Sequence, residues 1–314
     1  MAKNEALNGK LVVLMGGSGF VGTYVAQALL ERGARLRIAS RNPEKAFSLK
    51  PLANLGQLQF ARCNVRDQRS VDRTIADADA VVNLVGSFEG DLKRLMGESA
   101  GWMAAAASDA GAGAFVHVSA IAEDPDGSSE YAQAKKLGEE RVRENFPSAT
   151  ILCPSILFGE DDNFLSMFAG LVSTFPVLPV FGPDARIQPV FVDDVAEAIA
   201  RALEEPGTFG GKTFELGGPA TITMMELNQR IAHAQRRSRS FLPMPDSVSG
   251  LFASLPGTPM SSDQWGLLKA GNTVSGEHPG FDAFDIAPRP LDLFLDRWMT
   301  RYREHGRFTG RIRA

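Results

Sequence analysis

The chain has 314 residues, of which 44% are hydrophobic and 22% are charged, as in a folded globular protein and unlike a disordered one. The net charge of −4 gives no support to a nucleic-acid-binding surface. The four histidines are scattered and lack the paired spacing of metal ligands, so we expect no metal site.

The chain begins with MAKNEALNGK, which has no apolar run, so we expect no signal peptide and a cytoplasmic location with both cysteines reduced. The first predicted strand, residues 11–15, leads into GGSGFVG at 16–22 and then into an amphipathic helix. Three glycines spaced by three in this context predict a dinucleotide-binding loop, with phosphates at the helix N-terminus. The expected cofactor contacts here are Gly16, Ser18, Gly19, Phe20, Val21 and Gly22.

The second predicted strand, residues 35–40, ends in Ser40 and Arg41, where a site that prefers NAD(H) usually carries an acid. A guanidinium binds a phosphate better than a diol because it offers charge and a planar set of donors. We therefore expect NADP(H) to be preferred over NAD(H). The alternative is that Arg41 only stacks on the adenine and leaves the preference open.

Four further apolar runs, at 58–63, 80–85, 114–119 and 150–155, alternate with helical patterns. Runs that are apolar on both faces indicate a parallel sheet covered by helices, so we predict a Rossmann-type doubly wound α/β fold. The residues that end these strands are expected to contact the cofactor: Asn64, Val65, Leu84, Val85, Gly86, Val118, Pro154 and Ile156.

The helix after the fifth strand carries YAQAKK at 131–136. Residues four apart share one helix face, so Tyr131 and Lys135 are expected to lie side by side. A neighbouring cation lowers the pKa of a tyrosine, which makes the phenol usable in acid–base chemistry.

Beyond residue 155 the pattern loosens, and we predict a nucleotide-binding core over residues 1–155 and a mixed region over 156–314. Residues 189–205 are expected to return to the core, and the rest, including a short strand at 213–218, to form a smaller lobe for substrate or docking. The stretch 163–183 carries no charge, but its prolines exclude a membrane span, so we expect a buried helix to about Phe175 and then a loop. The tail 301–314 carries five arginines and one glutamate, which suits a solvated helix end and tail, or contact with an anionic surface or an acidic partner.

With GGSGFVG, the arginine after the second strand, NLVG, HVSAIA, YAQAK, PSILFG and PVFVDDVAEAI in this order, the chain resembles the extended or atypical short-chain dehydrogenases/reductases. More narrowly, FPSATILCPSILFGEDDNFL and GKTFELGGP resemble the family of the nucleotide-binding accessory subunit of mitochondrial complex I and its bacterial relatives.

The resemblance implies a nicotinamide cofactor and a catalytic set of Ser119, Tyr131 and Lys135. In it Tyr131 exchanges a proton with the substrate, Lys135 binds the nicotinamide ribose, and Ser119 polarises the carbonyl. If that last position corresponds to Ala120 or Ile121, the set is incomplete.

Two functions stay open. The first is an NADP(H)-dependent oxidoreductase for an apolar carbonyl, alcohol or quinone-like substrate. The second is a non-catalytic NADPH-holding accessory or assembly protein of a respiratory complex, peripheral to the inner membrane. A nucleotide-sugar epimerase or dehydratase ranks lower, because the later region has few cations to hold a diphosphate.

Overall fold

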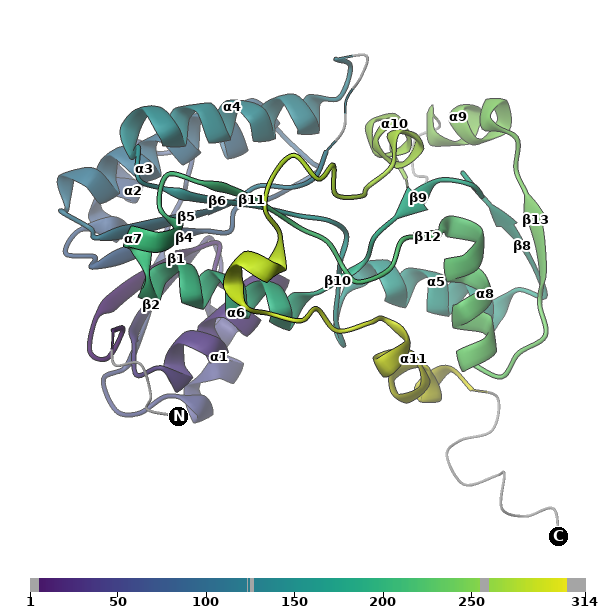
Figure 1. Cartoon of the computed structure of the whole chain (residues 1–314), viewed down its shortest axis with the longest axis horizontal. Helices are drawn as coiled ribbons and strands as arrows, with labels where there is room; N and C mark the ends of the chain where they lie inside the picture. The colour runs from purple at the N-terminus through teal and green to yellow at the C-terminus, as the bar shows by residue number, and fades with distance from the viewer. Residues whose placement is uncertain (1–5, 123, 125–126, 255–259, 304–314) are drawn as a thin grey trace, which may run out of the picture.

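The computed structural model describes residues 6–122, 124, 127–254 and 260–303 (Figure 1). Its centre is a seven-stranded sheet in which all neighbouring strands pair in parallel, in the order β11-β6-β5-β4-β1-β2-β3. The strands are β1 (Leu11–Met15), β2 (Arg35–Ser40), β3 (Leu58–Arg62), β4 (Ala80–Asn83), β5 (Ala114–Val118), β6 (Thr150–Pro154) and β11 (Thr213–Leu216). The predicted Rossmann-type doubly wound fold is confirmed.

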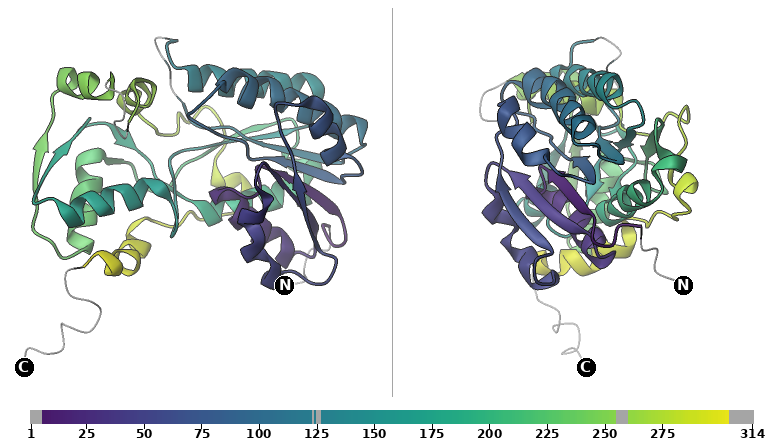
Figure 2. Two further views of the ribbon diagram at one scale, coloured as in Figure 1. Left: turned by 180° about the vertical axis from the view of Figure 1, so that it is seen from behind. Right: turned by 90° about the vertical axis from the view of Figure 1, so that its left-hand side faces the viewer.

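Helices cover both faces of this sheet, as the end-on view of Figure 2 shows. One face packs against α1 (Phe20–Glu31), α6 (Val192–Glu204), α7 (Pro206–Phe209), the 3-10 helix η1 (Pro43–Leu52) and the 3-10 turn η3 (Phe281–Phe284). The other face packs against α2 (Gln68–Ile75), the π-helical turn η2 (Lys93–Glu98), α3 (Ser99–Asp109) and α4 (Glu130–Asn145). Because both faces are covered, β1, β5 and β6 are buried at every residue.

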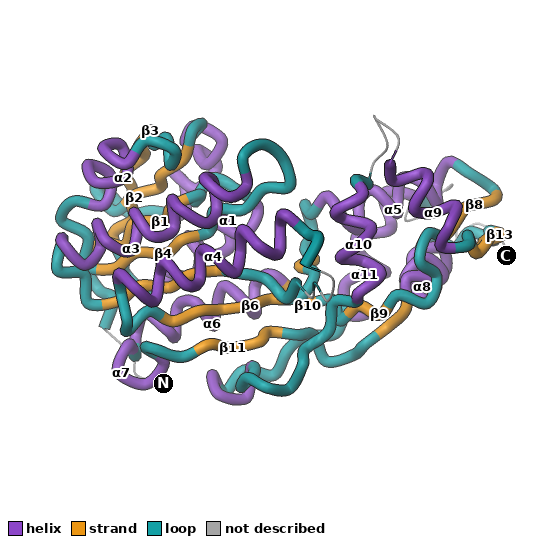
Figure 3. Tube along the Cα trace, turned by 90° about the horizontal axis from the view of Figure 1, so that it is seen from above, coloured by secondary structure: helices purple, strands orange, loops and turns teal. Residues whose placement is uncertain are grey.

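A smaller lobe lies beyond the C-terminal ends of the strands (Figure 3). We call it the small lobe; it contains α5 (Asn163–Thr174), β8 (Val177–Val180), β9 (Arg186–Ile187), β12 (Ile222–Thr223), α8 (Met224–Ala234), β13 (Ser240–Pro243), α9 (Asp246–Ser254), α10 (Ser262–Ala270), α11 (Asp292–Trp298) and η4 (Met299–Tyr302). A two-stranded ladder of β7 (Leu157–Phe158) and β10 (Val190–Phe191) joins it to the core. Its own apolar cluster includes Phe158, Leu165, Val172, Leu227 and Trp298.

Two predictions for this later region are wrong. Residues 213–216 do not belong to the small lobe; as β11 they pair with β6 and complete the central sheet, where they cover the edge that β6 would otherwise expose. The segment after α5 is not a loop, because Val177–Val180 forms β8 and pairs in parallel with β13.

The uncharged stretch gives the predicted helix α5, which buries Leu165, Ala169 and Val172 but leaves Met167 and Leu171 partly exposed. Among the described residues, no helix is long and apolar enough to cross a membrane. The arginine-rich tail lies outside the described residues from 304 onward. The division of the chain at residue 155 stays a prediction.

Candidate nucleotide and tyrosine site

The glycine loop has the geometry that a dinucleotide requires. Gly16 has φ +82°, and a Cβ there would stand 3.1 Å from the Leu84 backbone. A Cβ on Gly22 would stand 2.4 Å from the Gly17 carbonyl oxygen, so only glycine lets α1 pack this closely on the loop. Among the atoms of the described residues, a Cβ on Gly19 would meet only the Gly16 oxygen within 4 Å, which leaves its outer side open.

Helix α1 begins at Phe20 with no side-chain cap and no acid in its first turn. Its first backbone N–H groups, in the segment of Phe20, Val21 and Gly22, are therefore available to an anion. The Phe20 ring itself packs against Tyr24 at 5.5 Å between centroids, so this residue would serve a phosphate through its backbone. These features fit the pyrophosphate of a dinucleotide.

The corner after β2 joins a serine pair to two arginines. The Ser18 hydroxyl donates to the Ser40 hydroxyl at 2.8 Å, which links the glycine loop to the end of β2. Arg41 follows and is exposed. Arg62, the register partner of Ser40, donates from Nε to the Arg41 carbonyl at 3.1 Å. Sequence reasoning missed Arg62, although its place at the end of the neighbouring strand could have revealed it.

The remaining predicted cofactor residues also lie at the C-terminal ends of the strands. Asn64 is exposed after β3 and accepts from the Arg66 N–H at 3.1 Å, while Val65 is buried. Leu84, Val85 and Gly86 follow β4, and a Cβ on Gly86 would stand 3.9 Å from Lys135 Nζ. The residues that follow β4 therefore lie close to the glycine loop on one side and to the Lys135 amine on the other.

Tyr131 and Lys135 lie in the first turns of α4, which Ser129 caps by accepting from the Ala132 N–H at 3.1 Å. Lys135 is only 5% exposed, and its amine donates to the Val118 carbonyl at 3.2 Å. The amine stands 5.8 Å from the Tyr131 ring centroid, so the predicted neighbourhood of these two side chains is present. The Tyr131 backbone N–H donates to Asp263, whereas its hydroxyl makes no hydrogen bond to another described residue.

The predicted direction of the tyrosine shift is wrong. Burial, followed by the negative charge of Asp263, raises the pKa of Tyr131 above its ordinary value. Burial also lowers the pKa of Lys135 to about 8. The loss of water around both side chains outweighs the attraction between the phenolate and the ammonium.

The Ser119 hydroxyl points to another partner. It donates to Glu139 Oε1 at 2.6 Å, and that carboxylate also accepts from Arg143 at 3.2 Å. The proton of this hydroxyl is therefore committed to Glu139 in the structure. The catalytic role of Ser119 stays a prediction.

Phe88, which sequence reasoning did not identify, stacks on Tyr131 with 4.4 Å between centroids and 18° between ring planes. It comes from the loop after β4 and is 51% exposed. The half-exposed ring of Phe88 therefore gives the site an apolar surface next to the Tyr131 ring. No local pattern around Phe88 marks it as a site residue.

The small lobe reaches this site through two polar side chains. Asp263 of α10 accepts from the Tyr131 backbone N–H at 3.3 Å. Asn272 donates to the Ile121 carbonyl and accepts from the Ile156 N–H, both at 2.6 Å. Ile156, a predicted cofactor contact, is thus held where β6 meets the small lobe, and Pro154, the other predicted contact here, is the last residue of β6. Neither contact has a local sequence signal, since each spans more than 100 residues of chain.

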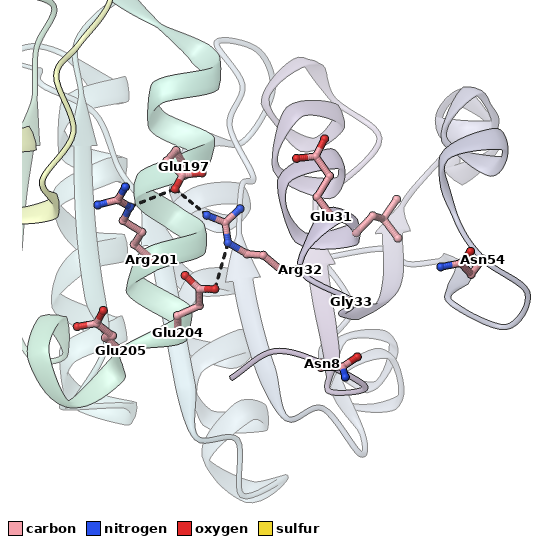
Figure 4. Close-up of a pocket in the computed structure, with 10 residues that line it drawn as sticks. Asn8, Glu31, Arg32, Gly33, Asn54, Glu197, Arg201, Glu204 and Glu205 are labelled. Atoms are coloured by element: carbon pink, nitrogen blue, oxygen red, sulfur yellow. Dashed lines mark hydrogen bonds and ion pairs between the residues drawn. The ribbon is translucent and has the colours of Figure 1, made fainter. Parts of the chain in front are cut away.

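A separate hollow, with a volume of about 910 Å³, opens near the N-terminal ends of β1 and β2, away from the glycine loop (Figure 4). Its lining includes Asn8 before β1 and Gly33 before β2. Arg32 bridges it by ion pairs to Glu197 at 2.6 Å and Glu204 at 3.2 Å. These contacts tie α1 to α6, so we interpret the hollow as structural. Among the described residues, no group of His, Cys, Asp and Glu could hold a metal ion.

Comparison with known proteins agrees with this geometry. The model of the NAD dependent epimerase/dehydratase family matches residues 12–217. The mitochondrial NADH dehydrogenase (ubiquinone) 1 alpha subcomplex subunit 9 of Arabidopsis thaliana is 28% identical over 96% of this chain and 80% of its own length. A ceramide reductase of Caulobacter vibrioides is 28% identical over 62% of each chain.

Among solved structures, the NADPH-dependent quinone oxidoreductase QOR2 of Escherichia coli superposes with a TM-score of 0.72. The match covers 90% of this chain and 98% of that chain, at 18% sequence identity. At this identity the likeness concerns the fold alone.

Proposed function

Because the chain belongs to the NAD dependent epimerase/dehydratase family, we propose that it is an NADP(H)-dependent oxidoreductase that reduces an apolar carbonyl, with Tyr131 as proton donor. The observation that carries this proposal is the pair on α4: Lys135 is buried and donates to the Val118 carbonyl, and its amine lies 5.8 Å from the ring of Tyr131, whose hydroxyl makes no hydrogen bond to the described residues. Both residues lie at the same end of the sheet as the glycine loop, beyond the C-terminal ends of the strands. Transfer of a hydride and a proton to one carbonyl requires that the cofactor and the proton donor be close together in this way.

Burial raises the pKa of Tyr131, so its phenol holds a proton at neutral pH. This is the protonation state from which the phenol can donate to a carbonyl oxygen as hydride arrives. The bound cofactor would supply the hydride, and Lys135 would hold its nicotinamide ribose. Phe88 supports an apolar substrate, because its exposed ring flanks the phenol.

The reaction is tested by incubating the NADPH-loaded protein with a panel of quinones, aldehydes and ketones and following absorbance at 340 nm. We expect oxidation of NADPH by at least one compound. Tyr131→Phe should slow it by about 100-fold or more, because general acid catalysis contributes roughly 10²–10⁴. Unchanged oxidation in Tyr131→Phe would contradict the assignment, provided that NADPH still binds this variant.

We propose further that the cofactor is NADP(H) rather than NAD(H), on the strength of Arg41 and the serine pair at Ser18 and Ser40. Arg41→Asp should weaken NADPH binding at least about 10-fold more than NADH binding, because it removes the phosphate ligand and supplies a diol ligand. Fluorescence titration of the reduced cofactors measures both constants. Equal losses would show that Arg41 only stacks on the adenine.

A second function is favoured by one observation, namely the similarity to a respiratory NADH dehydrogenase subunit over 96% of this chain. In that case NADPH would stabilise an accessory or assembly protein, peripheral to a membrane complex, and would not turn over. The engagement of Ser119 by Glu139 is compatible with such a role. NADPH that binds but stays reduced with every compound of the panel would favour it over the oxidoreductase.

A further inference from the structure

Glu139 lies one helical turn after Lys135 and contacts the side chains of Ser119, Cys153 and Arg143. It follows Lys135 by four residues, so both lie on the same face of α4. Lys135 contacts the Val118 carbonyl, and Glu139 accepts from the hydroxyl of the next residue, Ser119. Two consecutive residues at the end of β5 are therefore held by two consecutive turns of one helix.

The carboxylate is fixed by more than one contact. Its Oε1 accepts from Ser119 at 2.6 Å and lies 3.8 Å from the Cys153 thiol, which donates to it. Its Oε2 pairs with Arg143 at 3.2 Å, and Arg143 also donates to Thr213 on β11 at 2.9 Å. The Glu139 side chain is 19% exposed, so its charge acts through a poorly solvated medium.

The ionisable groups around the Lys135 amine are Tyr131 and Glu139 on its own helix, His117 on β5 and Cys153 on β6. Burial lowers the pKa of Lys135 to about 8, and the charges of Cys153 and Glu139 oppose this shift. Burial, however, raises the pKa of the Cys153 thiol and lowers the pKa of His117 to about 3, while Tyr131 keeps its proton. At neutral pH these three groups carry no charge, so the acidic side chain whose charge acts on Lys135 among the described groups is Glu139, which forms its direct ion pair with Arg143.

We propose that Glu139 is a positioning residue of this site, which engages the Ser119 hydroxyl and supplies the counter-charge for the buried Lys135 ammonium. Tyr131 and Lys135 then contact substrate and cofactor, Glu139 acts on Lys135, and Ser119 serves as a hydrogen-bond donor to the Glu139 carboxylate. This inference rests on the proposed function, because it assumes that Lys135 binds the cofactor.

The test measures the dissociation constant of NADPH by fluorescence titration between about pH 6.5 and about pH 9.5. For the wild type we expect binding to weaken as pH rises through about 8, where Lys135 loses its charge. Glu139→Gln keeps the shape and an acceptor for Ser119 but removes the charge. It should move this midpoint down by about half a pH unit or more, so that binding is weaker by about 2-fold near pH 8 and about 3-fold near pH 9, and nearly equal to wild type near pH 6.5.

Three further variants make the result specific. Glu139→Asp retains the charge and should restore a midpoint close to wild type. Glu140→Gln changes the exposed neighbour and should leave the midpoint unchanged. Lys135→Met should bind NADPH weakly at every pH. Its titration shows how the dissociation constant depends on pH without the Lys135 amine, for example through ionisation of the cofactor phosphate.

A loss in Glu139→Gln that is equal at all pH values, or a midpoint equal to that of Glu140→Gln, would overturn the inference. In either case weak binding by Lys135→Met would leave the proposed cofactor site standing. Wild-type binding by Lys135→Met would instead refute the cofactor role of Lys135, and with it both proposals. Thermal melting of each variant confirms that the protein titrated is folded.

Discussion

Lys135 carries its amine into the protein interior, where the ammonium has lost most of its water. The pKa of this group is about 8 in the folded chain and about 10.5 in an unfolded chain, so the unfolded state binds the proton more tightly. Folding is therefore penalised by this residue below about pH 8, and the penalty fades as pH rises toward about 10.5. A residue kept at such a cost is expected to have a use other than stability.

Lys135→Met should accordingly raise the free energy of unfolding at pH 7, because an apolar side chain replaces a buried charge of similar length. The gain should shrink between about pH 8 and about pH 10.5, where the folded wild-type lysine is already neutral and the unfolded lysine still holds its proton. Urea unfolding at pH 7 and pH 10 measures both values. Lys136→Met, at an exposed neighbour, serves as control and should change neither.

At the scale of elements, the small lobe is attached to the reactive edge by the segment from α10 to Asn272. Asp263 contacts the first turn of α4, and Asn272 bridges the loop after β5 and the residue that leaves β6. The lobe therefore fixes the backbone on both sides of the predicted nicotinamide position.

Asn272→Ala should lower the free energy of unfolding by about 1–3 kcal/mol, because it leaves the Ile121 carbonyl and the Ile156 N–H without their partner. In this variant the amide hydrogen of Ile156 should also exchange faster than in the wild type, by a larger factor than the amides in the strands of the core. Asn42→Ala, at an exposed residue, is the matched control. Equal stabilities of the two variants would show that the bridge contributes nothing.

The elements also show what a sequence can and cannot predict. The strands of the core were predictable because runs such as LVVLM are apolar at every position, as burial on both faces demands. Glu139 was within reach, since it follows Lys135 at helical spacing. The assignment of β11 failed because four residues, TFEL, carry no information about the strand beside which they lie. Asp263 and Asn272 act across the fold, and no local pattern signals such contacts.

At the scale of the whole molecule, the two helices that cover one face of the sheet come from distant parts of the chain. Arg32, just after α1, pairs with Glu197 and Glu204 on α6, and its side chain is only 19% exposed. It also donates to the Ala28 carbonyl at 3.0 Å. The first and sixth helices are thereby joined through one guanidinium.

Arg32→Met should lower the free energy of unfolding by about 1–3 kcal/mol, because it leaves Glu197 and the largely buried Glu204 with less compensation. Denaturant unfolding measures this loss. Arg35→Met removes a charge from an exposed position nearby and is expected to change stability by less than about 0.5 kcal/mol. Cofactor affinity should remain unchanged in both variants, because both arginines lie near the N-terminal ends of the strands and the predicted cofactor contacts lie at the C-terminal ends.

The position of β11 has a consequence for the nascent chain. The first 154 residues contain six of the seven strands, but the edge of β6 finds its partner only when residues 213–216 have left the ribosome. During that interval an apolar strand edge, ending in Cys153 and Pro154, is open to pairing with another chain. A protein truncated before residue 213 should therefore aggregate during synthesis, even though its nucleotide loop and its tyrosine helix are complete.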